Sequence, residues 1–250
     1  MKRVTFAALI SLSLVNGVVQ VQAAPLTFES RESQATLIEL YTSEGCSSCP
    51  PAEKWLSGLK ENTGLWRDFV PVAFHVDYWD YLGWRDPWSA KAFSARQRAY
   101  ARVWGSGNIY TPGFVLNGSE WRDWASRKIK PSLAKPGVLK ISSDDSNHWQ
   151  IVFTPTTPGD SKFDACAAFL ASGLSSDVKA GENAGRRLEH DFVVLSLARE
   201  SLSSREGAFR TALTFDKSQK AIGGRLGVAV WVTRRNSLEV LQATGGWLTQ

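Results

Sequence analysis

The stretch TLIELYTSEGCSSCPPAEKWLSGLK, residues 36–60, contains the strongest structural pattern in the chain. Its first part, 36–41, is apolar and rich in strand-forming residues, so it predicts a buried strand. Apolar residues then recur at the spacing of one helix face: Ala52, Trp55, Leu56 and Leu59. That spacing predicts an amphipathic helix, whose first turn can hold the two prolines that follow Cys49. Cys46 and Cys49 are therefore expected at a strand-to-helix junction.

A Cys-x-x-Cys pair at the start of a helix favours thiol–disulfide chemistry. The unpaired N–H groups and the partial positive charge of the helix N-terminus both stabilise a thiolate. We expect Cys46 to be the exposed nucleophile and Cys49 to resolve the mixed disulfide. Zinc is an alternative for such a pair, but it would need further Cys or His ligands nearby in the sequence. The next candidate ligand, His75, lies far beyond Cys49 in a predicted strand.

The remaining pattern divides the chain into two segments. A strand is predicted over 69–79, a helix over 89–104 and a short strand over 114–116. Residues 131–137 contain two prolines and a glycine and are typical of a linker. About seven short strand patterns, separated by turn residues, then predict a mainly β, sandwich-like domain over 138–250.

The first 23 residues are typical of a cleavable signal peptide. Lys2 and Arg3 precede a mostly apolar stretch, and small residues favour cleavage after Ala23. Removing these two of the 29 basic residues leaves 27 against 24 acidic ones, a mild net charge of +3. No basic stripe indicates nucleic-acid binding, and no run reaches the roughly 18 apolar residues of a membrane span. We therefore expect a periplasmic or secreted protein that neither binds nucleic acid nor spans a membrane.

The order of strand, C-x-x-C, helix, strand, helix and Thr-Pro resembles the thioredoxin superfamily. The resemblance implies an α/β thioredoxin-like domain over 24–130, with an inserted loop and helix, ahead of the β-rich domain. It also implies a cis-proline at Thr111-Pro112 that orients the thiol partner. Glu39 lies roughly where the superfamily keeps a buried carboxylate, which can accept the proton of the resolving thiol. Residue 45 departs from the pattern, because it is Gly where thioredoxins usually carry Trp.

A closer resemblance is to the domain of unknown function 1223 family, secreted bacterial thioredoxin-like proteins. It rests on five blocks: LYTSEGCSSCPP, HVDYWD, YTP, GENAGRRLEHDFVV and VLQA. The family implies an exported location but no activity, because it is named for the lack of a known one.

Three other groups of residues are candidates for roles near the cysteines. Aromatic side chains that could line a substrate groove crowd one loop: Tyr78, Trp79 and Trp84. A long loop rich in Gly and polar residues could pack against the first domain and complete the site: Glu182, Asn183, Arg186 and His190. Cys166, in a predicted buried strand, is expected to be a free cysteine that acts as a small hydrophobic residue.

The leading hypothesis is an exported thiol–disulfide oxidoreductase that needs no cofactor or metal. Its partners would be protein or small-molecule thiols and disulfides, with a membrane redox partner as a further candidate. An alternative is copper binding by the two cysteines with His75 or His190, since thiolate and imidazole suit Cu(I). A third is a non-catalytic binding module in which Cys46–Cys49 is a static disulfide.

Overall fold

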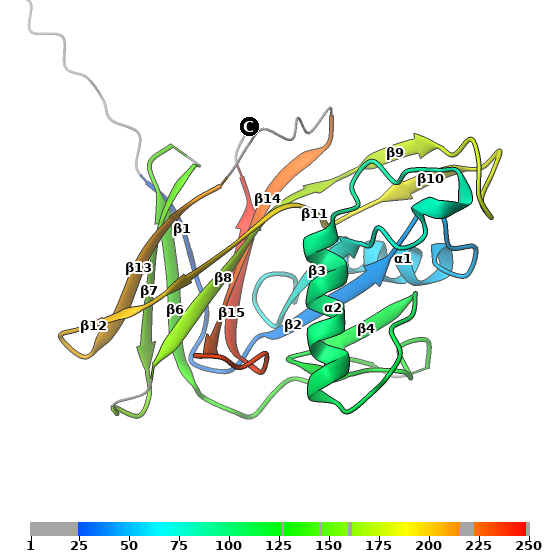
Figure 1. Ribbon diagram of the computed structural model, residues 1–250. Helices are drawn as coiled ribbons and strands as arrows, with labels where there is room; N and C mark the ends of the chain where they lie inside the picture. The colour runs from blue at the N-terminus through cyan, green and yellow to red at the C-terminus, as the bar shows by residue number, and fades with distance from the viewer. Residues whose placement is uncertain (1–24, 127, 146, 160–161, 216–222, 249–250) are drawn as a thin grey trace, which may run out of the picture.

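The computed structural model describes residues 25–126, 128–145, 147–159, 162–215 and 223–248. The predicted signal peptide lies outside these residues. Figure 1 shows two sheets on the left and centre of the molecule, with the helices gathered on the right.

The larger sheet has eight strands and contains the strand that leads to the cysteines. In spatial order they are β15 (Val240–Trp247), β14 (Arg225–Arg234), β8 (Phe163–Ser172), β11 (Val193–Ser201), β3 (Phe69–His75), β2 (Thr36–Thr42), β4 (Gly113–Leu116) and β5 (Ser119–Glu120). β3 runs parallel to both β2 and β11, and the other neighbouring pairs are antiparallel.

Two smaller groups of strands complete the β structure. A five-stranded antiparallel sheet has the order β1 (Leu26–Glu29), β6 (Gly137–Ser143), β7 (His148–Pro155), β13 (Ala208–Thr214) and β12 (Ser203–Arg205). Its alternating buried residues, such as Trp149 and Ile151 of β7, form one core with Ala167 and Val230 of the larger sheet. A separate hairpin, β9 (Leu174–Asp177) and β10 (Arg187–His190), extends beyond the end of β8.

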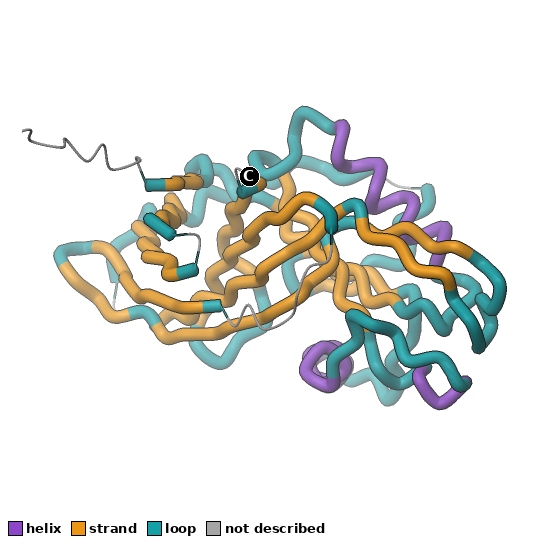
Figure 2. The backbone as a smooth tube through the Cα atoms, turned by 90° about the horizontal axis from the view of Figure 1, so that it is seen from above, coloured by secondary structure: helices purple, strands orange, loops and turns teal. Residues whose placement is uncertain are grey.

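Helices cover both faces of the larger sheet around β2 and β3 (Figure 2). On one face α1 (Pro50–Ser57), followed by the short 3-10 helix η1 (Gly58–Glu61), packs against Ile38 and Leu40 of β2. On the other face lies α2 (Lys91–Val103), after the 3-10 turn η2 (Asp80–Leu82). Its Phe93 and Tyr100 pack among Leu37, Tyr41 and Phe74. β2 is therefore buried on both sides, which explains its nearly continuous apolar sequence.

The predicted fold class, an α/β thioredoxin-like domain followed by a sandwich-like domain, is wrong. The described residues are mostly β, with only two short α-helices and large sheets. Strands from both sides of the predicted linker at 131–137 share the eight-stranded sheet, because β11 pairs with β3 at Val193 and Ala73. The local hydrophobic pattern indicates that strands exist, but it does not determine which distant strand pairs with which.

Position 245 in β15 requires glycine, because the neighbouring strand β14 and the side chain of Trp66 both lie close to it. A Cβ on Gly245 of β15 would collide with the Val228 carbonyl and lie 2.9 Å from Trp66 Cε3. Gly245→Ala should therefore destabilise the fold by about 1–3 kcal/mol through overpacking, measured as a lower urea midpoint. The control is Gly107→Ala, since a Cβ there meets nothing within 4 Å. Equal midpoints for the two variants would contradict the prediction.

Candidate functional site

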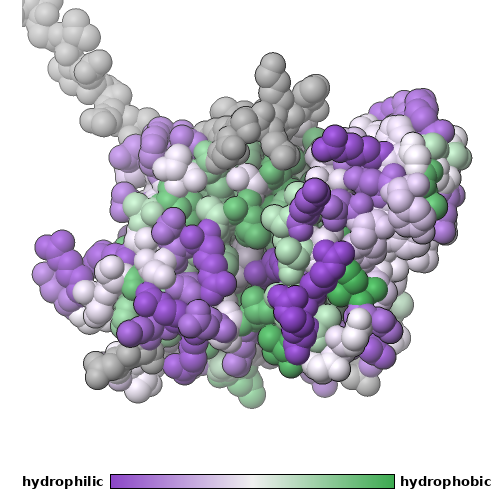
Figure 3. Space-filling view, in the orientation of Figure 1, coloured by the Kyte–Doolittle hydropathy of each residue, from purple (hydrophilic) through white to green (hydrophobic). Residues whose placement is uncertain are grey.

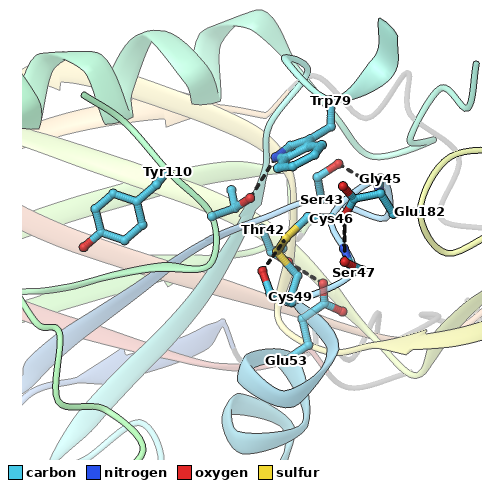
Figure 4. Close-up of a disulfide and its surroundings, with 12 residues drawn as sticks. Thr42, Ser43, Gly45, Cys46, Ser47, Cys49, Glu53, Trp79, Tyr110 and Glu182 are labelled. Carbon is cyan, nitrogen blue, oxygen red and sulfur yellow. Dashed lines mark hydrogen bonds between the residues drawn. A yellow bond between two sulfur atoms is a disulfide. The ribbon is translucent and has the colours of Figure 1, made fainter. Parts of the chain in front are cut away.

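A disulfide between Cys46 and Cys49 lies at the junction between β2 and α1 (Figure 4). The two Cα atoms are 5.5 Å apart. Cys49 is the N-cap residue of α1, and its carbonyl accepts hydrogen bonds from the N–H groups of Ala52 and Glu53. The two prolines occupy the first helical positions, where a missing N–H costs nothing.

Both sulfur-bearing residues are buried in this disulfide-bonded form. Cys46 is 1% exposed and Cys49 0%, whereas Ser47 and Ser48 between them are exposed. The predicted exposure of Cys46 is therefore wrong for the oxidised protein. A small molecule can reach the disulfide only if the chain that covers it moves.

The tip of the β9–β10 hairpin is hydrogen-bonded to the backbone beside the disulfide. Asn183 Nδ2 donates hydrogen bonds to the carbonyl oxygens of Glu44, at 2.8 Å, and of Cys46, at 2.9 Å. Asn183 is 0% exposed, and its own side-chain oxygen accepts a bond from Arg186 Nη1 at 2.7 Å. These bonds fasten the hairpin to the backbone of the C-S-S-C motif.

A second fastening lies at the surface. Glu182 Oε2 accepts hydrogen bonds from the backbone N–H of Ser47, at 2.9 Å, and from its hydroxyl, at 2.7 Å. These two bonds hold the pKa of Glu182 below its usual value. Hydrophilic and weakly polar residues cover most of the end of the molecule that holds β9 and β10 (Figure 3). We refer to residues 178–186, which form the hairpin tip, as the latch loop.

Of the aromatic residues that the sequence proposed as a groove, Trp79 lies beside the motif. Trp79 packs against Gly45, where an added Cβ would lie 2.8 Å from the Trp79 Cβ. The indole N–H of Trp79 (Figure 4) donates to Thr111 Oγ1 at 2.8 Å, which brings Trp79 close to the cis Thr111–Pro112 bond. The glycine at position 45 is thus the residue that lets Trp79 approach the cysteines.

The other two aromatic residues use their polar atoms inside the protein. The Tyr78 hydroxyl donates to Gln97 Oε1 at 3.1 Å, and burial raises its pKa to about 12. The Trp84 indole N–H donates to Glu44 Oε2 at 2.6 Å. Both contacts fix the aromatic loop to the core.

Glu39 lies away from the cysteines. Ile38 and Leu40 face α1, so strand alternation directs Glu39 to the opposite face, toward α2. Arg96 binds both carboxylate oxygens, at 2.7 and 2.8 Å, and Tyr100 donates to one of them at 2.5 Å. The buried carboxyl one helical turn beyond Cys49 is Glu53 instead.

A buried cluster of acids and imidazoles lies behind the disulfide. Its members come from five places in the chain and are 0–7% exposed: Glu44, Glu53, His75, Asp86 and His190. His190 Nδ1 is 2.5 Å from Glu53 Oε2, and its Nε2 is 3.0 Å from Glu44 Oε1. His75 Nδ1 is 2.7 Å from Asp86 Oδ2. Asp86 Oδ2 also accepts the backbone N–H of Glu44 at 2.9 Å.

The charges of the cluster stabilise one another. Burial alone would lower the pKa of His190, but Glu53 and Glu44 outweigh burial and raise it to about 10. Burial would raise the pKa of Glu53, but His190 holds it below its usual value. Burial would also raise the pKa of Asp86, but its contact with His75 helps to lower that pKa below its usual value. The sequence pointed to His190, but it did not indicate that Glu44 and Glu53, on either side of the motif, are buried.

Cys166 of β8 is free and buried, which confirms the prediction for it. Burial raises the pKa of its thiol. Among the described residues no helix has the length and apolar character needed to cross a membrane.

These features define a mostly β protein with a covered Cys-x-x-Cys disulfide backed by a buried ionic cluster. A model for proteins of unknown function, DUF1223, matches residues 37–233. The chain belongs to this family, which confirms the resemblance seen in its sequence blocks. No curated protein shows a significant match.

Two solved structures share the fold at low sequence identity. Protein AGR_C_4864 from Agrobacterium tumefaciens is 24% identical, with a TM-score of 0.56 over 86% of this chain and 95% of that one. HBP35 of Porphyromonas gingivalis is 13% identical, also with a TM-score of 0.56, over 86% of this chain and 76% of that one. At these identities the likeness concerns the fold.

Proposed function

We propose that this protein carries out thiol–disulfide exchange through Cys46 and Cys49. The observation that carries the proposal is the disulfide itself, formed across two residues at the start of a helix. So short a loop loses little chain entropy when it closes, and the bond therefore contributes little to stability. A purely structural role is therefore a weak explanation for this disulfide, and reversible thiol–disulfide exchange is a stronger one.

The exchange is a two-electron transfer with a dithiol partner. A thiolate of the partner attacks Cys46 Sγ, the Cys46–Cys49 bond breaks, and Cys49 leaves as a thiolate that takes up a proton. The second partner thiol then attacks the mixed disulfide and releases Cys46, so the partner ends oxidised and this protein reduced. The reverse sequence oxidises a partner. The N–H groups at the start of α1 favour the thiolate of Cys46 when the bond is open.

Protein or small-molecule thiols and disulfides are the partners that this chemistry requires, and an exported location follows from the proposed signal peptide. An oxidising compartment allows such a disulfide to persist. The copper alternative has less support. The group of potential ligands found among the described residues joins His75 and His190 to Glu53 and includes neither cysteine.

The test is disulfide reduction of insulin and refolding of a scrambled protein in glutathione buffers of varied ratio. We expect turnover by the wild type and by the control Cys166→Ser, and none by Cys46→Ser. Cys49→Ser should accumulate a mixed disulfide at Cys46. Absence of wild-type turnover in every buffer would overturn the proposal. So would a Cys46–Cys49 potential well below about −300 mV, the range of structural disulfides, and it would favour the static binding module.

A further inference from the structure

Three potential metal ligands from distant elements converge behind the disulfide. Glu53 lies on α1, His75 ends β3 and His190 ends β10. One ligand atom from each lies within 4.8 Å of the others, and all three residues are buried. Such convergence of two imidazoles and a carboxylate is unusual for side chains that only fill a core.

The strongest pointer to a ligand is an unpartnered nitrogen. His75 is 0% exposed, and its Nε2 has no hydrogen-bond partner. The other ring nitrogen, Nδ1, is held by Asp86 at 2.7 Å. An imidazole that donates its Nδ1–H to a carboxylate presents the lone pair of Nε2, which is the usual arrangement of a metal-binding histidine. A buried polar atom without a partner is otherwise destabilising.

The other two ligands have the same design. His190 has Nε2 fixed by Glu44 at 3.0 Å, and Glu53 has Oε1 fixed by the hydroxyl of Thr42. In each ligand a buried outer partner holds one atom, which leaves a second atom for an ion. Outer partners of this kind orient metal ligands and strengthen their donation.

Packing also holds the two rings in place. The His75 and His190 ring centroids are 5.0 Å apart, and the Trp88 ring lies 5.6 Å from the first and 4.9 Å from the second. Carboxylates of Glu44, Glu53 and Asp86 surround the imidazoles, so the local charge favours a cation.

We propose that Glu53, His75 and His190 bind a divalent transition-metal ion of the zinc type, through Glu53 Oε2, His75 Nε2 and His190 Nδ1. Two nitrogens and one carboxylate oxygen suit Zn²⁺ or Fe²⁺, whereas Ca²⁺ and Mg²⁺ prefer oxygen ligands alone. The ion would replace the proton shared between Glu53 and His190, which are 2.5 Å apart, and that proton would leave to solvent. Binding would tie the β9–β10 hairpin to α1 and β3.

The test uses tag-free protein, stripped with a chelator and kept disulfide-bonded so that no thiolate is available. Titration with Co²⁺ should saturate at one equivalent and give visible d–d bands without a sulfur charge-transfer band. Zn²⁺ should displace the Co²⁺. His75→Gln and Glu53→Gln should weaken binding at least about tenfold, as loss of metal-site groups does. The control His148→Gln should not change it, because His148 is exposed and lies beside Asp145.

The wild type also provides a test that does not depend on the folding of any variant. The chain has three histidines, so NMR of the Co²⁺ form should show two histidine ring signals with hyperfine shifts and one, from His148, without. Absence of saturable binding to the wild type would overturn the proposal. So would unchanged affinity in a folded His75→Gln variant, or a large hyperfine shift of His148 alone.

Discussion

Asn183→Ala is expected to speed reduction of the Cys46–Cys49 disulfide by dithiothreitol about 10- to 100-fold. Asn183 satisfies the carbonyl oxygens of Glu44 and Cys46 from a fully buried position. When the latch loop is closed, its loss takes the side-chain donor from the Glu44 carbonyl and leaves the Cys46 carbonyl with only the Cys49 N–H, at 3.2 Å. Each unsatisfied group costs about 1–3 kcal/mol, so the closed form loses stability relative to an open one. The disulfide is then exposed more often.

The rate is measured under pseudo-first-order conditions by trapping the thiols with an alkylating agent. The control is Glu189→Gln, an exposed position on β10 in the same hairpin. Cys166, which is free and buried, reports on global unfolding, because its alkylation should stay slow in all three proteins. An unchanged reduction rate for Asn183→Ala would show that the latch loop does not control access. Rapid alkylation of Cys166 would show that any faster reduction of the disulfide results from unfolding of the whole chain.

The local elements around the cysteines were predictable from sequence. β2 and α1 are encoded within one short stretch, by a run of apolar residues and then by apolar residues at helical spacing. Long-range pairing was not predictable in this way. One of the two neighbours of β3 is β11, from far along the chain, and this pairing joins both halves into one sheet. A single sequence contains no periodic signal for such a pairing.

The buried cluster was missed for a related reason. Glu53 occupies a helix position that a sequence pattern assigns to solvent, because charged residues are almost never buried without a partner. Its partner, His190, is supplied by the hairpin far along the chain. For Glu39 the strand was predicted correctly, but the sequence did not indicate to which face of the sheet its side chain points. Both faces of β2 are covered, so no alternation of polar and apolar residues indicated the direction of its side chain.

Arg96→Met should destabilise the protein by about 3–5 kcal/mol, the usual cost of breaking a buried ion pair. Arg96 is the bidentate partner of Glu39, which is 0% exposed. Its guanidinium also lies 5.3 Å from the ring centroid of Tyr100 and 5.2 Å from that of Trp231. Methionine fills similar space but leaves the Glu39 carboxylate buried without a cation. Urea unfolding should show the loss as a lower midpoint.

The double variant Glu39→Gln with Arg96→Met separates the charge from the packing. If the unpaired carboxylate causes the loss, removing its charge should recover most of the stability, and the two substitutions should be strongly non-additive. A double variant as unstable as Arg96→Met alone would instead assign the loss to the aromatic contacts of Arg96. The double variant also tests the role that the sequence predicted for Glu39, which was to accept the proton of the resolving thiol. Because Glu39 faces α2 and the cysteines lie at the start of α1, its thiol–disulfide exchange should proceed at the wild-type rate.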